Sequence, residues 1–224
     1  MTHLDIELRT LKEGMVEMFQ MVTLQMQKAK DSLIHLDKDL AHEVIVNEKR
    51  VNSFELKLDR DCENIFALFQ PVAVDLRFVL ACLKINSNLE RTGDIAEGIA
   101  RFALKINSPL DSKLQESTRL LEMFKIADEM MREVTLAFET EDTKISRAVF
   151  QKDERLDEIN LNANTAVADF IKSNPERINQ SLYVLSTVRK LERVGDQCLN
   201  IAEEIIFYLE AKVLKHLPPK MQSE

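Results

Sequence analysis

The sequence predicts an all-α protein made of two tandem three-helix bundles, and three observations lead to that prediction. The 224 residues include only four glycines and five prolines, so few positions interrupt a helix. Apolar residues recur at three- and four-residue steps through most of the chain, which is the period of an amphipathic helix. A short motif occurs twice, as LERTGDIAEGIA from Leu89 to Ala100 and as LERVGDQCLNIA from Leu191 to Ala202. Because the copies lie about half a chain length apart, we infer an internal duplication.

Six long helices account for this periodicity. In the first half we expect helices from about 4 to 36, 40 to 68 and 72 to 105, with a turn at Gln70-Pro71 because proline suits only the first turn of a helix. In the second half we expect helices from about 114 to 140, 143 to 172 and 175 to 212, with Asn174-Pro175 at the inner turn. Asn107-Ser108-Pro109 is the clearest break, and Ser112 is a candidate N-cap after it. The predicted domains are residues 1–108 and 109–216, followed by a frayed tail, 217–224.

Composition and charge exclude several classes of function. The net charge of −8 opposes non-specific binding to nucleic acid, whose phosphates require a basic face. No run of about 18 apolar residues is present and the N-terminal MTHLDIELRT is polar, so we expect neither a membrane span nor a secretory signal. The three scattered cysteines are typical of structural thiols in a reducing cytoplasm. No glycine-rich phosphate loop and no catalytic Ser/His/Asp order occurs, so we predict that the chain is not an enzyme.

An acidic segment lies opposite each copy of the motif. Residues equidistant from the turn of an antiparallel helical hairpin meet at the same height, and residues four apart share one face of a helix. Centred on Pro71 are the pairs Glu48–Asp94 and Asn52–Glu90. Centred on the Asn174-Pro175 junction are the pairs Asp153–Asp196 and Asp157–Glu192. Each half is therefore expected to bring two polar i, i+4 pairs together.

These carboxylates predict one metal site in each half, because a bound cation would remove the repulsion between them. The ligand atoms are all oxygens, which suits magnesium, manganese, calcium or iron rather than a structural zinc. The candidate ligands of the first half are Glu48, Asn52, Glu55, Glu90 and Asp94, with Glu97 as a further candidate. Those of the second half are Asp153, Asp157, Glu192 and Asp196, with Asn160 and Glu203 as further candidates. Asn52 stands where the second half has an aspartate, which predicts a weaker first site.

Solvated, charge-rich helix faces are the alternative interpretation, because 30% of the residues are charged. Two copies, each opposite an acidic segment, favour the metal interpretation. Gly195 also supports the metal interpretation. It lies on the apolar seam of its helix, where glycine costs about 1 kcal/mol relative to alanine, and its position there predicts the close approach of a neighbouring helix. Two alternatives in function stay open. One is a metal-free helical adaptor, and the other is a carboxylate-bridged redox enzyme, although the paired Glu-x-x-His of di-iron bundles is missing.

At these residues the sequence resembles the PhoU family of phosphate-signalling proteins. The matching stretches are QPVAVDLRF, LKINSNLERTGDIAEGIA, VNEKRVNSFE, KDERLDEIN and KLERVGDQCLNIAEE, and they run in order along nearly the whole chain. The resemblance implies two PhoU-type bundles, metal clusters held by E/D-x-x-x-D motifs, and a cytoplasmic role as a negative regulator of the phosphate-starvation response. The implied partners are a phosphate-specific ABC transporter and a membrane sensor histidine kinase, and a homodimer is also expected. One departure is Gly98, which stands where the second copy of the motif has Asn200.

Overall fold

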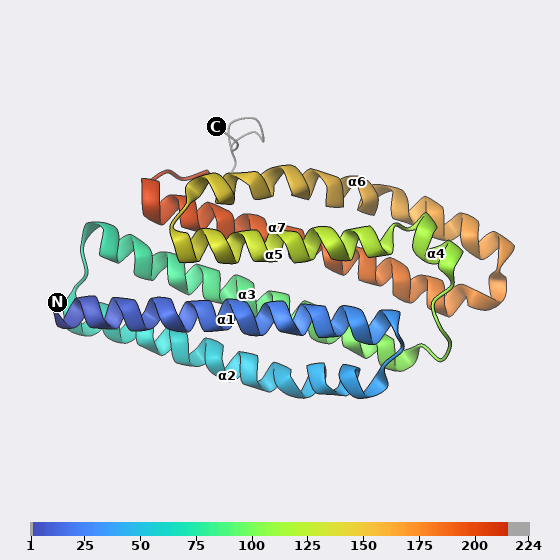
Figure 1. The fold of residues 1–224 in the computed structure, drawn as a ribbon, viewed down its shortest axis with the longest axis horizontal. Coiled ribbons are helices and arrows are strands. Elements are labelled where there is room, and N and C mark those ends of the chain that lie inside the picture. Colours follow the sequence, from blue (N-terminus) through green and yellow to red (C-terminus); the bar gives the residue numbers. More distant parts are fainter. Residues whose placement is uncertain (1, 215–224) are drawn as a thin grey trace.

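The computed structural model describes residues 2–214 as helices joined by short turns (Figure 1). The first bundle contains α1 (His3–Ile34), α2 (Lys38–Phe69) and α3 (Ala73–Lys105). The second contains α4 (Ser112–Ser117), α5 (Leu120–Thr140), α6 (Thr143–Ser173), the short 3-10 helix η1 (Pro175–Arg177) and α7 (Ile178–Glu210). No strand occurs within residues 2–214. The prediction of two tandem three-helix bundles with six long helices is confirmed, while the predicted tail, 217–224, lies outside the described residues.

The two bundles lie side by side along their length (Figure 1). Helix α1 packs against α5, and α3 packs against α7, so the two helices that carry the repeated motif are also in contact with each other. The buried apolar residues of both bundles form a single cluster with no gap at the linker. The division into domains at residue 108 therefore stays a prediction. Among residues 2–214, no helix combines the length and the apolar character that crossing a bilayer requires.

The repeated motif fills the core with small side chains. Its apolar seam on α3 (Leu89, Gly93, Ala96, Ala100, Ala103) is buried throughout. On α7 the corresponding seam from Val188 to Ile205 is buried too, and Cys198 belongs to it as a free thiol. Small residues let neighbouring helices approach closely, and burying the larger ones contributes about 1.5–3 kcal/mol each.

The predicted helix from 114 to 140 is interrupted, which corrects the sequence-based boundary. Arg119 adopts a left-handed conformation (φ 53°, ψ 33°) that ends α4 and begins α5. Its guanidinium is held by both carboxylate oxygens of Glu122 in the first turn of α5, at 2.7 and 2.6 Å, which stabilises the break. The N-cap of α4 is Asp111 rather than Ser112, because the Asp111 carboxylate accepts from the N–H groups of Lys113 (2.9 Å) and Leu114 (3.3 Å).

Two other helix ends also differ from the prediction. Helix α1 ends at Ile34 rather than near residue 36, since Leu36 has a left-handed φ of 56°. Helix α7 ends at Glu210, because Ala211 is left-handed. The end of α3 is closed by a side chain from the start of α2: the Lys38 ammonium donates to the carbonyls of Leu104 (2.9 Å), Ala103 and Ile106.

Two candidate carboxylate sites

The first candidate site surrounds Glu48, on α2 opposite the motif of α3. Only 4% of Glu48 is exposed, and neither of its carboxylate oxygens has a hydrogen-bond partner. Burial, and after it the charges of Asp94, Glu97 and Glu90, raise the pKa of Glu48 to about 7. Nearby Gln25 lowers this pKa, but its N–H is directed to the Val44 carbonyl at 3.0 Å. The hairpin therefore gathers the predicted carboxylates around one buried oxygen pair.

Gly93 makes the room that Glu48 occupies. A Cβ atom at this position would lie 3.1 Å from Glu48 Oε2, 3.2 Å from Oε1 and 3.2 Å from Val51 Cγ1. The glycine in LERTGD thus lets a carboxylate, and not merely a helix backbone, approach the α3 axis. Sequence reasoning anticipated the close approach of a neighbouring helix but not which side chain fills the space.

The other predicted residues of the first site lie around its mouth. Glu55 is half-buried, and burial, Asp59 and Glu90 raise its pKa. Asn52 and Asp94 are exposed on α2 and α3. The pairing of the two helices is fixed nearby, where the Asn86 amide donates to the Glu55 carbonyl and to Asp59 Oδ1, both at 2.9 Å. These contacts confirm a hairpin centred at Pro71.

The second candidate site repeats the arrangement around Asp153, on α6. Asp153 is 9% exposed, and its buried Oδ1 has no hydrogen-bond partner. Burial, and then the charges of Asp157, Asp196 and Glu192, raise its pKa to about 7. A Cβ atom at Gly195 would lie 2.6 Å from Asp153 Oδ1, so the motif glycine faces a buried carboxylate in this half too.

The remaining carboxylates of the second half form the exposed side of this site. Burial raises the pKa of both Glu192 and Asp196, and the charge of Asp157 raises both further. Asp157 and Asp196 are exposed, whereas Glu192 is half-buried. Asn160 and Glu203, the further candidates, are half-buried and lie farther along α6 and α7. Glu192 and Asp196 therefore flank the core as expected, but Asp153 enters it.

The donor chemistry of both clusters fits a hard cation. Every candidate ligand atom is an oxygen, and each cluster holds a buried carboxylate with at least one oxygen that no protein group satisfies. As the side chains stand within residues 2–214, no group of three or more His, Cys, Asp or Glu is close enough to hold a metal ion. A bound cation would require the exposed Asp94 and Asp196 side chains to turn toward the buried carboxylates.

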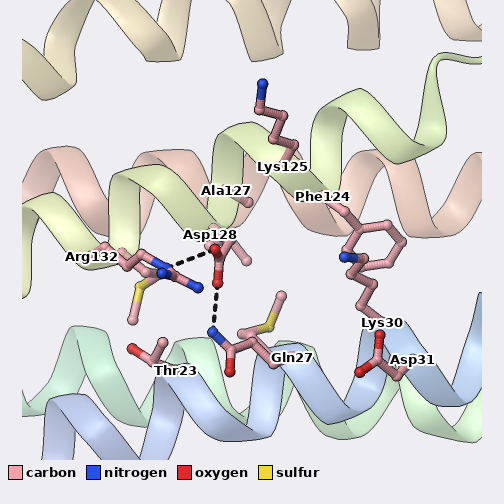
Figure 2. A pocket seen from close by; sticks show the side chains of 12 residues that line it. Thr23, Gln27, Lys30, Asp31, Phe124, Lys125, Ala127, Asp128 and Arg132 are labelled. Carbon is pink, nitrogen blue, oxygen red and sulfur yellow. Dashed lines mark hydrogen bonds and ion pairs between the residues drawn. The ribbon is translucent and has the colours of Figure 1, made fainter.

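A separate cavity of about 310 Å³ lies between α1 and α5, at the contact between the bundles (Figure 2). Three of its polar side chains interact: the Gln27 amide donates to Asp128 Oδ1 at 2.8 Å, and Arg132 Nε lies 2.8 Å from Asp128 Oδ2. The Lys125 side chain extends away from it (Figure 2). This chain of contacts joins the two bundles, and the cavity contains none of the predicted site residues.

Comparison with known proteins decides the family. The family model of the PhoU domain matches residues 15–103 and again residues 120–205, so both halves carry the domain. The chain belongs to the PhoU family. Both motif copies and both buried carboxylates lie inside the two matched PhoU segments.

Individual PhoU relatives match over nearly their whole length. A phosphate-specific transport system accessory protein PhoU homolog from Burkholderia sp. is 30% identical over 221 residues, covering 98% of this chain and 94% of the relative. The accessory protein PhoU of Escherichia coli K12 is 31% identical over 211 residues, covering 94% and 87%. The crystal structure of PhoU from Pseudomonas aeruginosa matches with a TM-score of 0.85 at 28% identity, over 94% of this chain and 100% of the other. That of the phosphate transport system regulatory protein PhoU from Streptococcus pneumoniae gives 0.82 at 26%, over 94% and 99%.

Proposed function

We propose that this protein is an accessory protein of a phosphate-specific transport system and a negative regulator of the phosphate-starvation response. It acts by binding the phosphate ABC transporter and a membrane sensor histidine kinase, and its carboxylate sites hold divalent or trivalent cations such as iron, manganese or magnesium. Its relatives in Burkholderia and Escherichia coli are named as accessory proteins of phosphate-specific transport, which supports the role in transport.

One observation carries the cation-binding part of the proposal. Each half places a buried carboxylate with an unsatisfied oxygen against the motif glycine, and surrounds it with further carboxylates. An unpaired buried charge costs several kcal/mol, so such a group is stabilised by a proton or by a cation. Because the same arrangement occurs in both bundles, a binding function is favoured over an accidental result of side-chain packing.

Within each site, one buried carboxylate and several more exposed side chains would have different roles in holding a cation. Glu48 and Asp153 supply the buried oxygens. Glu90, Asp94, Asn52 and Glu55 would complete the first site, and Asp157, Glu192 and Asp196 the second. A bound cation would supply positive charge at the helix surface. The proposed output is a binding event, because the described residues offer no catalytic constellation and the family is one of accessory and regulatory proteins.

A deletion and a site variant in cells test the regulatory role. Deleting the gene should switch on phosphate-scavenging genes while phosphate is plentiful, and the double variant Glu192→Gln/Asp196→Asn should do so partially. The matched control is Asp169→Asn, which removes one charge from a side chain of α6 that is 62% exposed and lies outside the site. Normal repression in the deletion strain would show that the protein has a different function.

Metal analysis and unfolding test the sites directly. Purified protein should contain metal, the content should fall in both Asp94→Asn and Asp196→Asn, and removal by a chelator should lower the melting temperature. The second site should bind more tightly, because Asp157 is present where the first half has Asn52. A metal-free protein with a melting temperature unaffected by chelation or added metal would support the adaptor alternative. Oxygen consumption by the iron-loaded protein would support the redox alternative.

A further inference from the structure

A lysine of the second bundle reaches the first carboxylate site. Lys190 lies on α7, two residues before Glu192, but α7 packs against α3 and the Lys190 side chain extends across that contact. Its ammonium lies 5.7 Å from the centroid of the Phe102 ring of α3, at the distance of a cation–π interaction. Lys190, which directly precedes the second motif, therefore lies against the helix that carries the first.

Gly98 leaves room for the end of the Lys190 side chain. A Cβ atom at Gly98 would come within 2.8 Å of Lys190 Cε and closer still to Nζ, so a larger residue there would displace the ammonium from this position. Gly98 is one turn beyond Asp94 and next to Glu97, on the same face as Asp94. Burial, and after it the charge of Arg193, lower the pKa of Lys190, while the charges of Asp94 and Glu97 act in the opposite direction and favour its ammonium form. This explains the departure of the first motif at residue 98, for which the sequence alone gave no reason.

The second site has no equivalent of this lysine. The position in the first motif helix that corresponds to Lys190 is Asn88, and the position that corresponds to Gly98 is Asn200, whose side chain would occupy the space. Each site has a motif arginine, Arg91 acting on Glu90 and Arg193 on Glu192 and Asp196, but the first site also has Arg101, which lies 2.6 Å from Glu97. The duplicated helix in the second half has Glu203 in place of that arginine.

We propose that Lys190 is a built-in countercharge of the first carboxylate site, which lowers the affinity of that site for cations and thereby makes the two sites of the duplicated protein unequal. The inference rests on the cation binding proposed above and names the residue that sets the difference. It also connects the first site to the α3–α7 contact, since the Lys190 side chain crosses that contact and lies against Gly98, one turn from Asp94.

The expected size of the effect follows from Coulomb's law. Gly98, beside the ammonium, lies one helical turn from Asp94, or about 6 Å, and a unit charge at that distance from a divalent ion would change the binding constant by roughly tenfold at the dielectric constant of water. Removing Lys190 should therefore tighten binding at the first site by about tenfold. The second site should change little, because the Lys190 ammonium is held over α3.

Calorimetric titration of the full-length protein with Mn²⁺ tests this proposal site by site. An Asp153→Asn/Asp196→Asn background reports the first site, and an Asp94→Asn background reports the second. Lys190→Met is introduced into each, beside the control Lys172→Met, which removes the same charge from a side chain that is 75% exposed on α6. Gly98→Ala gives an independent variant, because it displaces the ammonium while keeping the lysine. Circular dichroism verifies that each variant is helical.

The expected result is tighter Mn²⁺ binding at the first site in Lys190→Met and in Gly98→Ala, with the second site and the control within about twofold of their parents. Equal tightening at both sites would show a net-charge effect and would overturn the proposal. So would an unchanged first site in a parent that binds Mn²⁺ there, although cation binding itself would then stand. If neither background binds Mn²⁺, the proposed cation binding is wrong and this inference falls with it.

Discussion

Replacing Gly195 by alanine tests whether the motif glycine exists to admit a carboxylate. The new Cβ would lie 2.6 Å from Asp153 Oδ1 and 2.7 Å from Leu156 Cδ1, both inside van der Waals contact. Overpacking of this kind costs about 1–3 kcal/mol, whereas alanine in a helix is about 0.5–1 kcal/mol better than glycine. The difference between these ranges runs from about 0 to 2.5 kcal/mol, and because two buried atoms lie closer than 3.0 Å to the new Cβ we expect a loss of about 1–2 kcal/mol.

Gly93→Ala provides the matched comparison within the same molecule. There the Cβ would meet the Glu48 carboxylate and Val51 at 3.1–3.2 Å, and the end of a glutamate side chain can move by a few tenths of an ångström. Strain and helix propensity should nearly cancel, so we expect a change within about 0.5 kcal/mol of zero.

Thermal unfolding of both variants with a chelator present measures the difference. For a chain of this size 1 kcal/mol shifts the melting temperature by about 2–4 °C, so Gly195→Ala should melt roughly 2–8 °C below the parent and Gly93→Ala close to it. Adding Asp153→Ala to Gly195→Ala should recover part of the loss, because it removes the atom that is struck. Equal stability of Gly195→Ala and the parent, or a larger loss in Gly93→Ala, would refute the reasoning.

Three further predictions concern the rest of the molecule. Burial raises the pKa values of Glu48 and Asp153 to about 7, so the folded protein binds a proton at each carboxyl more tightly than the unfolded chain does. The contribution of this protonation to the free energy of unfolding is complete below about pH 4 and is lost as the pH rises through 7. Metal-free protein should therefore lose stability between about pH 5 and pH 8 in urea unfolding, and Glu48→Gln/Asp153→Asn should flatten that slope. Lys38→Met should destabilise the first bundle by about 1.5–3 kcal/mol, because three carbonyls at the end of α3 lose a charged donor; an unchanged unfolding midpoint would contradict this. Gln180→Leu should speed proteolysis of the 106–111 linker, since the Gln180 amide donates to the Ser108 and Pro109 carbonyls (3.2 and 3.1 Å) and accepts from the Asp111 N–H (3.0 Å); identical cleavage rates would show that other contacts hold the linker.

The fold was largely predictable from the sequence because helical periodicity, proline and duplication are local or internal signals. The hairpin arithmetic succeeded for a similar reason: two antiparallel helices of constant rise place Glu48 against Asp94 and Asp153 against Asp196 once the turn is located. The break at Arg119 was not predictable, because arginine has no intrinsic preference for a left-handed conformation. Its conformation depends on the ion pair with Glu122 and on how α4 packs against α6 and α7.

The sequence predicted which residues make up the candidate sites but not which of them are buried. Spacing identified which carboxylates share a face, but it gave Glu48 and Asp94 equal standing, whereas one is buried and the other exposed. Burial depends on where the neighbouring helix axis lies, and no period along a single helix encodes that. The reach of Lys190 into the first site depends on how two separately predicted bundles dock. A signal for it did exist, since Gly98 broke the internal repeat at a helical position where glycine is unfavourable.

The buried carboxylates also bear on the choice between a regulator that binds cations and a metal-free adaptor. A chain selected only for packing would be more stable with an apolar side chain or an amide at Glu48 and Asp153, since both oxygens of Glu48 and Oδ1 of Asp153 are buried without a hydrogen-bond partner. Each of these residues instead faces a glycine that itself weakens the helix, so both bundles carry two unfavourable choices at the same point. Unfavourable residues that occur together in this way are expected where a ligand is bound. Because the same combination occurs in both bundles while the surrounding charges differ, we infer that each site binds a cation and that the two sites have diverged in how strongly they do so.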